Sequence, residues 1–220
     1  MKKTLLLAGV ATALLVANVN AAEFKPYVAV KALYTDVDAN MDWAYSDEYG
    51  SEKESYDVGD KGWGASLAIG VSNKLSHGAV RAELEFSQKA DADSSYTSYD
   101  ETFKNKIQAQ TLMLNAYYDI DTGTKLTPYV GAGIGYAKLE AKDEYWNLEY
   151  GKSIDKNNFA WQIGVGAAYN LTNNVSLDAG YRYIDYGNLS SSEIDDWGGH
   201  EKAKVDLTAN EFYLGARYMF

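Results

Sequence analysis

Few residues in this sequence could carry out acid–base or nucleophilic chemistry. The chain has two histidines and no cysteines among its 220 residues. His77 lies in the short segment SNKLSHG, and His200 lies in the polar segment DDWGGHEKAK. A hydrolase or acyltransferase needs a histidine held beside a serine or an acid, and we expect neither histidine to meet such a partner on a regular strand. The sequence therefore predicts a protein that is not an enzyme.

An acidic stretch, residues 36–60, is the best candidate for metal binding. It carries nine Asp or Glu and one Lys. Five residues have the spacing of positions 1, 3, 5, 7 and 12 of a calcium loop: Asp36, Asp38, Asn40, Asp42 and Asp47. Met41 stands where such a loop needs glycine, and Asp47 replaces the long bidentate glutamate. We expect a solvated acidic loop without a specific metal site.

Two glycine-rich stretches superficially resemble nucleotide-binding loops. They read GAGIG at residues 131–135 and GVGAAY at residues 164–169. Neither has the G-x-G-x-x-G spacing at the start of a helix that binds a dinucleotide. Both lie in segments where the side chains alternate in polarity, so we expect no cofactor and glycines that face a narrow interior.

The N-terminal segment, MKKTLLLAGVATALLVANVNAA, has the pattern of a secretory signal peptide. Lys2 and Lys3 precede a short apolar core, and small residues follow it. We expect cleavage after Ala21, which leaves residues 22–220 as one domain. Removing the two lysines changes the formal charge from -11 to -13, which argues against nucleic-acid binding.

The rest of the chain alternates in polarity with a period of two, which is typical of strands. Eight segments show this pattern: 24–35, 62–72, 79–88, 110–120, 128–137, 159–169, 175–186 and 210–220. No run of 18 apolar residues follows residue 22, so no transmembrane helix is predicted. The 19 Tyr, 19 Gly and 5 Trp also suit strands and aromatic belts at a membrane interface.

The connections between these segments alternate between long and short. Links of roughly 15 to 25 residues alternate with short ones such as SNKLSHG, DIDTGTKLT and NLTNN. This asymmetry is typical of outer-membrane barrels, which have short periplasmic turns and long extracellular loops. The predicted fold is all-β, a transmembrane eight-stranded antiparallel up-and-down β-barrel. The alternative is a soluble lipocalin-like barrel, which would have to expose the small, glycine-rich face to water.

The predicted inward face carries a balanced set of charges. Four are basic and four acidic: Lys31, Arg81, Arg182, Arg217, Glu83, Glu85, Asp178 and Glu211. The interior of an eight-stranded barrel is just wide enough for side chains, and buried charges there need partners. We expect a lumen charge network that holds the barrel shut, with a gated, narrow ion path as the alternative.

Three stretches resemble the small outer-membrane barrels of the opacity-protein and outer-membrane-protein-A transmembrane type. They are YVGAGIGYA at 129–137, LDAGYRYIDYG at 177–187 and the terminal YMF. The resemblance implies location in the cell outer membrane of a Gram-negative bacterium. It also implies insertion by the outer-membrane assembly machinery, which recognises a final strand that ends in an aromatic residue. Phe212, Tyr218 and Phe220 would form that assembly signal.

We expect the protein to support envelope integrity and surface adhesion or recognition through four acidic, aromatic-bearing loops. The recognition candidates are the loop aromatics Trp43, Tyr45, Tyr49, Tyr96, Tyr99, Tyr145, Trp146 and Trp197. Expected partners are outer-membrane lipid, lipopolysaccharide bridged loosely by divalent cations, and a host or surface ligand, with the chain as a monomer. A narrow porin or small-solute channel and a lipid-modifying enzyme are the alternative functions.

Overall fold

A computed structural model describes residues 24–46, 50–89, 92–98, 101–143, 154–194 and 200–220. The predicted signal peptide lies outside these residues and stays a prediction. In the described part of the chain no helix is long and apolar enough to cross a membrane. Regular structure there consists of strands: β1 Phe24–Ser46, β2 Ser51–Leu75, β3 Gly78–Lys89, β4 Ala92–Ser98, β5 Glu101–Ile120, β6 Leu126–Asp143, β7 Ile154–Asn170, β8 Val175–Ile194 and β9 His200–Met219.

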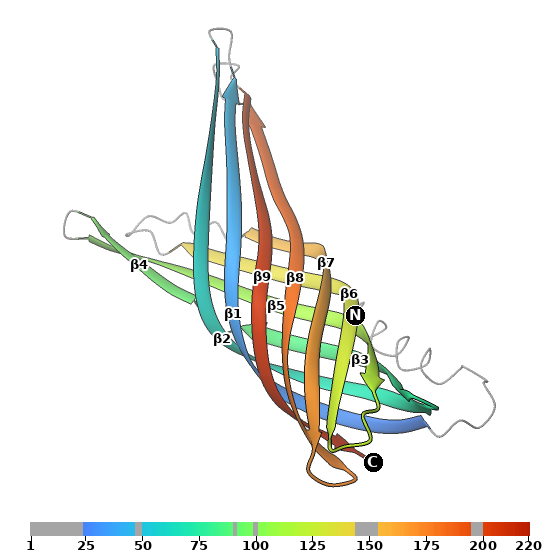
Figure 1. The fold of residues 1–220 in the computed structure, drawn as a ribbon. Helices are drawn as coiled ribbons and strands as arrows, with labels where there is room; N and C mark the ends of the chain where they lie inside the picture. The colour runs from blue at the N-terminus through green and yellow to red at the C-terminus, as the bar shows by residue number, and fades with distance from the viewer. Residues whose placement is uncertain (1–23, 47–49, 90–91, 99–100, 144–153, 195–199) are drawn as a thin grey trace, which may run out of the picture.

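The strands form one antiparallel sheet that closes on itself. Their order is β3-β2-β1-β9-β8-β7-β6-β5-β4, and a further pairing of β3 with β5 completes the cylinder. Within the described residues the barrel has eight strands, because β3 and β4 pair with successive lengths of the same strand, β5. The predicted fold class, a closed eight-stranded antiparallel up-and-down barrel, is confirmed (Figure 1).

The outer face of the cylinder is a continuous apolar band. Its exposed side chains include Val28, Val30, Leu67, Ile69, Leu112, Leu114, Val130, Ile134, Ile163, Val165, Leu177 and Leu214. Aromatic side chains border the band at one end with Trp63, Tyr136, Phe159, Trp161 and Phe212, and at the other with Phe24, Tyr118, Tyr169, Tyr218 and Phe220. We call these borders the outer and inner aromatic belts, as in membrane barrels. The part of the chain between them is the membrane-spanning segment.

The strands extend far beyond the outer aromatic belt, contrary to the prediction of long loops. Residues 36–60 were expected to form a solvated loop, yet β1 and β2 stay paired as far as Ser46 and Ser51. On its other side β1 pairs with β9 over the same length, and β9 pairs with β8. We call this four-stranded extension of β2, β1, β9 and β8 the extracellular ribbon (Figure 1). The ladder continues because its backbone groups satisfy one another while polar side chains on both faces meet water.

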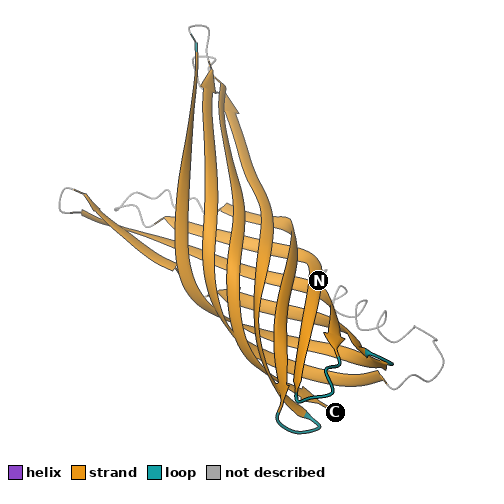
Figure 2. Ribbon diagram, in the orientation of Figure 1, coloured by secondary structure: helices purple, strands orange, loops and turns teal. Residues whose placement is uncertain are grey.

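The three predicted short links are tight turns at the opposite end of the barrel (Figure 2). They connect β2 to β3, β5 to β6 and β7 to β8. In the second turn Gly123 has a φ of 69° and its N–H is bound by Asp121 Oδ1 at 2.9 Å. A positive φ of this kind favours glycine, so the turn is encoded locally.

Candidate functional site

A network of buried ion pairs occupies the centre of the lumen. Lys31 Nζ donates to Glu83 Oε1 at 2.8 Å and to Glu85 Oε2 at 2.5 Å. Arg182 Nη1 lies 2.8 Å from Glu85 Oε1, and Arg182 Nε donates to Glu211 Oε1 at 2.5 Å. These five side chains are nearly inaccessible to water. Two cations, from β1 and β8, therefore link three carboxylates from β3 and β9, which fixes the four strands relative to one another.

The network continues toward the extracellular end through residues that the sequence analysis did not identify. Lys89 Nζ lies 3.3 Å from Glu211 Oε2, and Thr35 Oγ1 donates to the same oxygen at 2.7 Å. Lys89 Nζ also contacts the hydroxyl of Tyr186. Lys89 lies in phase with the inward residues of β3 but one position past the predicted strand end. Extending the period of two by one step would have found it.

Two further ion pairs lie toward the inner aromatic belt. Arg81 Nε donates to Asp119 Oδ1 at 3.0 Å and Oδ2 at 2.8 Å. Arg217 Nη2 lies 3.3 Å from Asp178 Oδ1. The structure thus buries all eight residues of the predicted charge set and places each in an ion pair. Asp119, which the prediction omitted, is in phase with the inward residues of β5.

Tyrosine rings packed over glycines fill the lumen next to the ion pairs. A Cβ added at Gly180 would lie 2.4 Å from Tyr213 Cζ, and one at Gly131 would lie 2.3 Å from Tyr117 Cδ1. Gly70 and Gly166 make the same close approach to Tyr27 and Tyr129. The pairs are Tyr27 with Gly70, Tyr117 with Gly131, Tyr129 with Gly166 and Tyr213 with Gly180. The glycine-rich stretches therefore provide space for rings in the lumen.

An apolar layer lies inside the barrel on the extracellular side of the ion pairs. Met113, Ala137, Ala160, Ile184, Tyr186 and Ala209 form one buried cluster, with Val37 and Leu207 packed against it. The sequence analysis placed Met113 on the inward face of its strand but did not identify an apolar layer. Ile184 and Tyr186 follow Arg182 at steps of two, so the signal was present but lay beyond the part of the strand that had been assigned faces.

The described residues include three of the recognition candidates, two of them on the extracellular ribbon. Trp43 and Tyr45 lie on β1, where their rings stack with centroids 6.2 Å apart and an interplanar angle of 9°. Tyr96 lies on β4, opposite Phe103 in the pairing with β5. The remaining candidates lie outside the described residues: Tyr49, Tyr99, Tyr145, Trp146 and Trp197. The three described candidates therefore lie on paired strands, where loops had been expected.

The calcium-loop spacing at residues 36–47 does not form a loop in the part that the structure describes. Asp36, Asp38, Asn40 and Asp42 lie on β1, and a strand rises about 3.3 Å per residue instead of wrapping round an ion. Ser55 Oγ donates to Asp42 at 2.8 Å. Across the described chain, no group of three or more His, Asp or Glu has the arrangement of a metal site.

Ion pairs on the ribbon shift the pKa of two exposed lysines. A hydrogen bond to Asp36, at 3.2 Å between Nζ and Oδ2, raises the pKa of Lys61 above its ordinary value. A hydrogen bond to Asp206, at 2.6 Å, raises the pKa of Lys204 in the same way. Both ammonium groups stay charged over the physiological range, and both partly offset the acidity of the ribbon.

His77 is not part of a catalytic arrangement in the described residues. Ser76 Oγ lies 2.9 Å from His77 Nδ1, but both residues occupy an exposed turn and are neighbours in sequence. No carboxylate is paired with His77 in the part of the chain that is described, and a nucleophile needs a base that a third group orients. His200 begins β9 at the outer end of the ribbon.

The predicted assembly-signal residues lie on the outer face of the last strand. Phe212 belongs to the outer aromatic belt, and its ring packs 5.1 Å from that of Tyr181. Tyr218 and Phe220 belong to the inner belt and meet edge to face at 5.1 Å. Phe220 N donates to Pro26 O at 3.0 Å, so the final residue extends the pairing of β9 with β1.

Comparisons with known proteins agree with this architecture. The outer membrane protein beta-barrel domain family matches residues 4–220. Outer membrane protein PagN of Salmonella typhimurium is 38% identical over 125 residues, which are 53% of this chain and 52% of that protein. The chain therefore aligns with about half the length of this relative. A candidate adhesin of Rickettsia bellii is 24% identical over 166 residues, 68% of this chain and 72% of that protein.

Solved structures share the fold at low sequence identity. Neisserial surface protein A has a TM-score of 0.52 and 21% identity, covering 86% of this chain and 99% of its own. OprG from Pseudomonas aeruginosa also has a TM-score of 0.52, with 14% identity over 88% of this chain and 95% of its own. The chain belongs to the outer membrane protein beta-barrel domain family and is a protein of the cell outer membrane.

Proposed function

We propose that this protein is a non-enzymatic surface barrel that attaches the cell to other surfaces through its extracellular ribbon. The observation that carries the proposal is the stacked pair of Trp43 and Tyr45 on a four-stranded sheet beyond the outer aromatic belt. Rigid aromatic side chains on a fixed scaffold supply contact area at small cost in conformational entropy. The similarity to a candidate adhesin over 68% of the chain supports the same role.

The closed lumen supports a structural part of this role, which is to hold the barrel rigid and preserve the envelope. Ion pairs, packed tyrosine rings and the apolar layer follow one another along the interior. A narrow channel is the alternative, and planar-bilayer recordings on the refolded protein separate the two. Steady, large conductance would overturn the closed lumen. A lipid-modifying enzyme is the other alternative, and mass spectrometry of lipid A from cells with and without the protein tests it.

The outer surface supports the proposed partners of the barrel. The apolar band would contact outer-membrane lipid and the outer aromatic belt would lie at the lipopolysaccharide interface. Pairing of β3 with β5 leaves no free strand edge between the belts, which supports a monomer. We propose that the assembly machinery recognises the side chains of Phe212, Tyr218 and Phe220.

An adherence assay tests the ribbon directly. The chain would be expressed in a non-adherent bacterium, and binding to cultured cells and immobilised matrix proteins would be counted for the wild type and for Trp43→Ala/Tyr45→Ala. A matched control is Tyr136→Ala, which also removes an exposed aromatic but from the outer aromatic belt. We expect the double variant to lose most of the adherence and the control to retain it, at equal surface expression. Equal adherence of all three would refute the ribbon as the recognition surface.

A further inference from the structure

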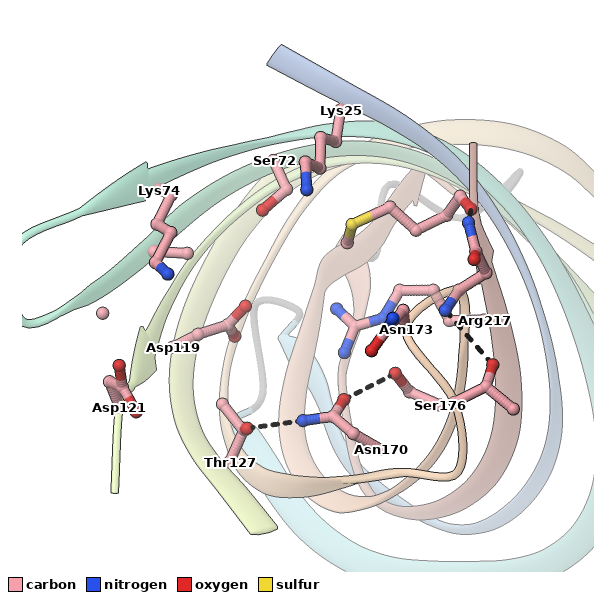
Figure 3. Close-up of a pocket in the computed structure, with 15 residues that line it drawn as sticks. Lys25, Ser72, Lys74, Asp119, Asp121, Thr127, Asn170, Asn173, Ser176 and Arg217 are labelled. Atoms are coloured by element: carbon pink, nitrogen blue, oxygen red, sulfur yellow. Dashed lines mark hydrogen bonds between the residues drawn. The ribbon is translucent and has the colours of Figure 1, made fainter. Parts of the chain in front are cut away.

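A polar cavity opens at the end of the lumen that carries the short turns. Its volume is about 510 Å³, and it is lined by residues of every described strand except β4 and by turns between the strands (Figure 3). The cavity is several times larger than the ~30 Å³ share of one water molecule and falls in the range of small-molecule sites. We call it the periplasmic vestibule, since short turns face the periplasm in this family.

A buried guanidinium faces this vestibule, and two of its nitrogen atoms have no hydrogen-bond partner among the described residues. Arg217 is 5% exposed, and Figure 3 shows its side chain reaching into the cavity beside Asn173. Its Nη2 pairs with Asp178 at 3.3 Å. Its Nε and Nη1 have no hydrogen-bond partner among the described residues. Buried polar groups in folded proteins nearly always form hydrogen bonds. We therefore expect these N–H groups to have an acceptor.

The charges around Arg217 favour an acceptor that is anionic. Lys25 and Lys74 also line the vestibule, against Asp119 and Asp121. Asp119 is already neutralised by two contacts from Arg81, at 3.0 and 2.8 Å. Counted with the partners Arg81 and Asp178, the vestibule has four cationic and three anionic side chains, in a chain whose net charge is -11. A guanidinium binds carboxylate and phosphate oxygens through charge-assisted hydrogen bonds.

Three neutral side chains of the vestibule wall form hydrogen bonds with one another. Asn170 Nδ2 donates to Thr127 Oγ1 at 3.1 Å, and Ser176 Oγ donates to Asn170 Oδ1 at 2.8 Å (Figure 3). These bonds hold the wall of the cavity without using the Arg217 donors. The inner end of the vestibule is bounded by the ion pair of Arg81 with Asp119, so a ligand enters from the periplasmic side.

We propose that the periplasmic vestibule binds a small oxyanion, a phosphate or carboxylate group, on Arg217. Arg217 Nε and Nη1 donate to the oxyanion, while Lys25 and Lys74 attract it to the opening. Asp178 holds the guanidinium in place from the opposite side. The site is separate from the extracellular ribbon and does not depend on the proposed adhesion.

Calorimetric titration of the full chain, refolded in zwitterionic detergent, tests the site. Inorganic phosphate is the first probe, and acetate is the second, added alone and in competition. We expect saturable binding of phosphate at millimolar concentration or below, weakened about tenfold or more by Arg217→Gln, as expected for losing charge-assisted hydrogen bonds. Displacement of phosphate by acetate would assign the site to carboxylates as well; failure of acetate to displace it would restrict the site to phosphate.

Matched variants separate the site from general charge and folding effects. Lys125→Gln removes a lysine from the exposed turn at the same end that does not line the cavity, and it should leave binding unchanged. Arg217→Gln/Asp178→Asn removes both charges of the ion pair, so that no buried carboxylate without a partner destabilises the fold. We expect this folded double variant to lose phosphate binding. Unchanged binding in the double variant, or no saturable binding of either anion to the wild type, would overturn the proposal.

Discussion

Replacing Arg182 with methionine removes the cation that joins two halves of the lumen network. Its guanidinium contacts Glu85 at 2.8 Å and Glu211 at 2.5 Å, and both carboxylates are at most 1% exposed. Methionine has a similar length and no charge, so the variant keeps most of the volume. The change therefore reports on the loss of the ion pairs more than on a cavity.

The expected loss of stability follows from the partners that remain. Removing one member of a buried ion pair typically destabilises a protein by about 3–5 kcal/mol, because the other charge stays buried without its partner. Glu85 would keep Lys31 at 2.5 Å, and Glu211 would keep Lys89 at 3.3 Å. These retained cations place the expected loss near the lower limit, at about 3 kcal/mol. That corresponds to roughly a 100-fold change in the folding equilibrium.

Urea titration of the barrel in phospholipid vesicles measures this loss, with tryptophan fluorescence and gel mobility as two readouts of folding. Arg182→Met/Glu85→Gln should recover part of it, since Lys31 keeps Glu83 and Lys89 keeps Glu211, so that two cations again face two carboxylates. Lys61→Gln, which breaks an exposed ion pair on the ribbon, should leave the urea midpoint unchanged. A loss below about 1 kcal/mol for Arg182→Met, the range of exposed pairs, would refute the view that the network holds the barrel together.

Three further changes test other parts of the structure. Gly180→Ala would place a Cβ 2.4 Å from the ring of Tyr213, so we expect a loss of about 1–3 kcal/mol in the same urea titration. Deleting Phe220 should lower insertion into the outer membrane of cells, measured by surface protease accessibility, while refolding in detergent is nearly unchanged. The hydrogen bond to Asp206 raises the pKa of Lys204, so its stabilising effect is present below the ordinary lysine value of 10.5 and is lost as pH rises through the raised pKa. NMR titration of the Lys204 side chain checks this.

Each of these changes has a control or a contradicting result. Gly50→Ala adds a Cβ with nothing within 4 Å, so it should be far milder than Gly180→Ala. Equal insertion with and without Phe220 would remove it from the proposed assembly signal. Asp206→Asn should return the pKa of Lys204 toward its ordinary value, and an unchanged titration would show that the hydrogen bond does not form in solution.

The membrane-spanning half of the fold could be predicted from the sequence, because successive side chains of a strand face lipid and lumen in turn. Lipid favours apolar side chains, and the lumen holds the buried ion pairs. Leu214 faces lipid and Arg217 faces the lumen, three residues apart on β9 and on opposite sides of it. A register shift of one residue would reverse every such pair. The period of two is therefore strong evidence for both the strands and the buried charges.

Outside the membrane this constraint disappears, and the sequence analysis failed there for that reason. Residues such as Asp38 and Asp57 have water on both sides of the sheet, so polar side chains at successive positions neither favour nor oppose a strand. The ribbon is instead determined by pairing between segments far apart in sequence, such as Asp36 with Asn210. Composition therefore predicted a loop where backbone pairing continues.

The same distinction explains the irregularity of β8. The pairing of β8 with β9 shifts between Asp185 and Asn188, and Gly187 takes a φ of 75° with its N–H bound by Asp185 Oδ1 at 2.7 Å. A bulge of this kind bends a strand and increases its twist. It follows Ile184, includes Tyr186 of the apolar layer and lies at the base of the ribbon. The bulge thus marks the point where the strand passes from a closed cylinder, whose inner face must be filled, to an open sheet, whose two faces meet water.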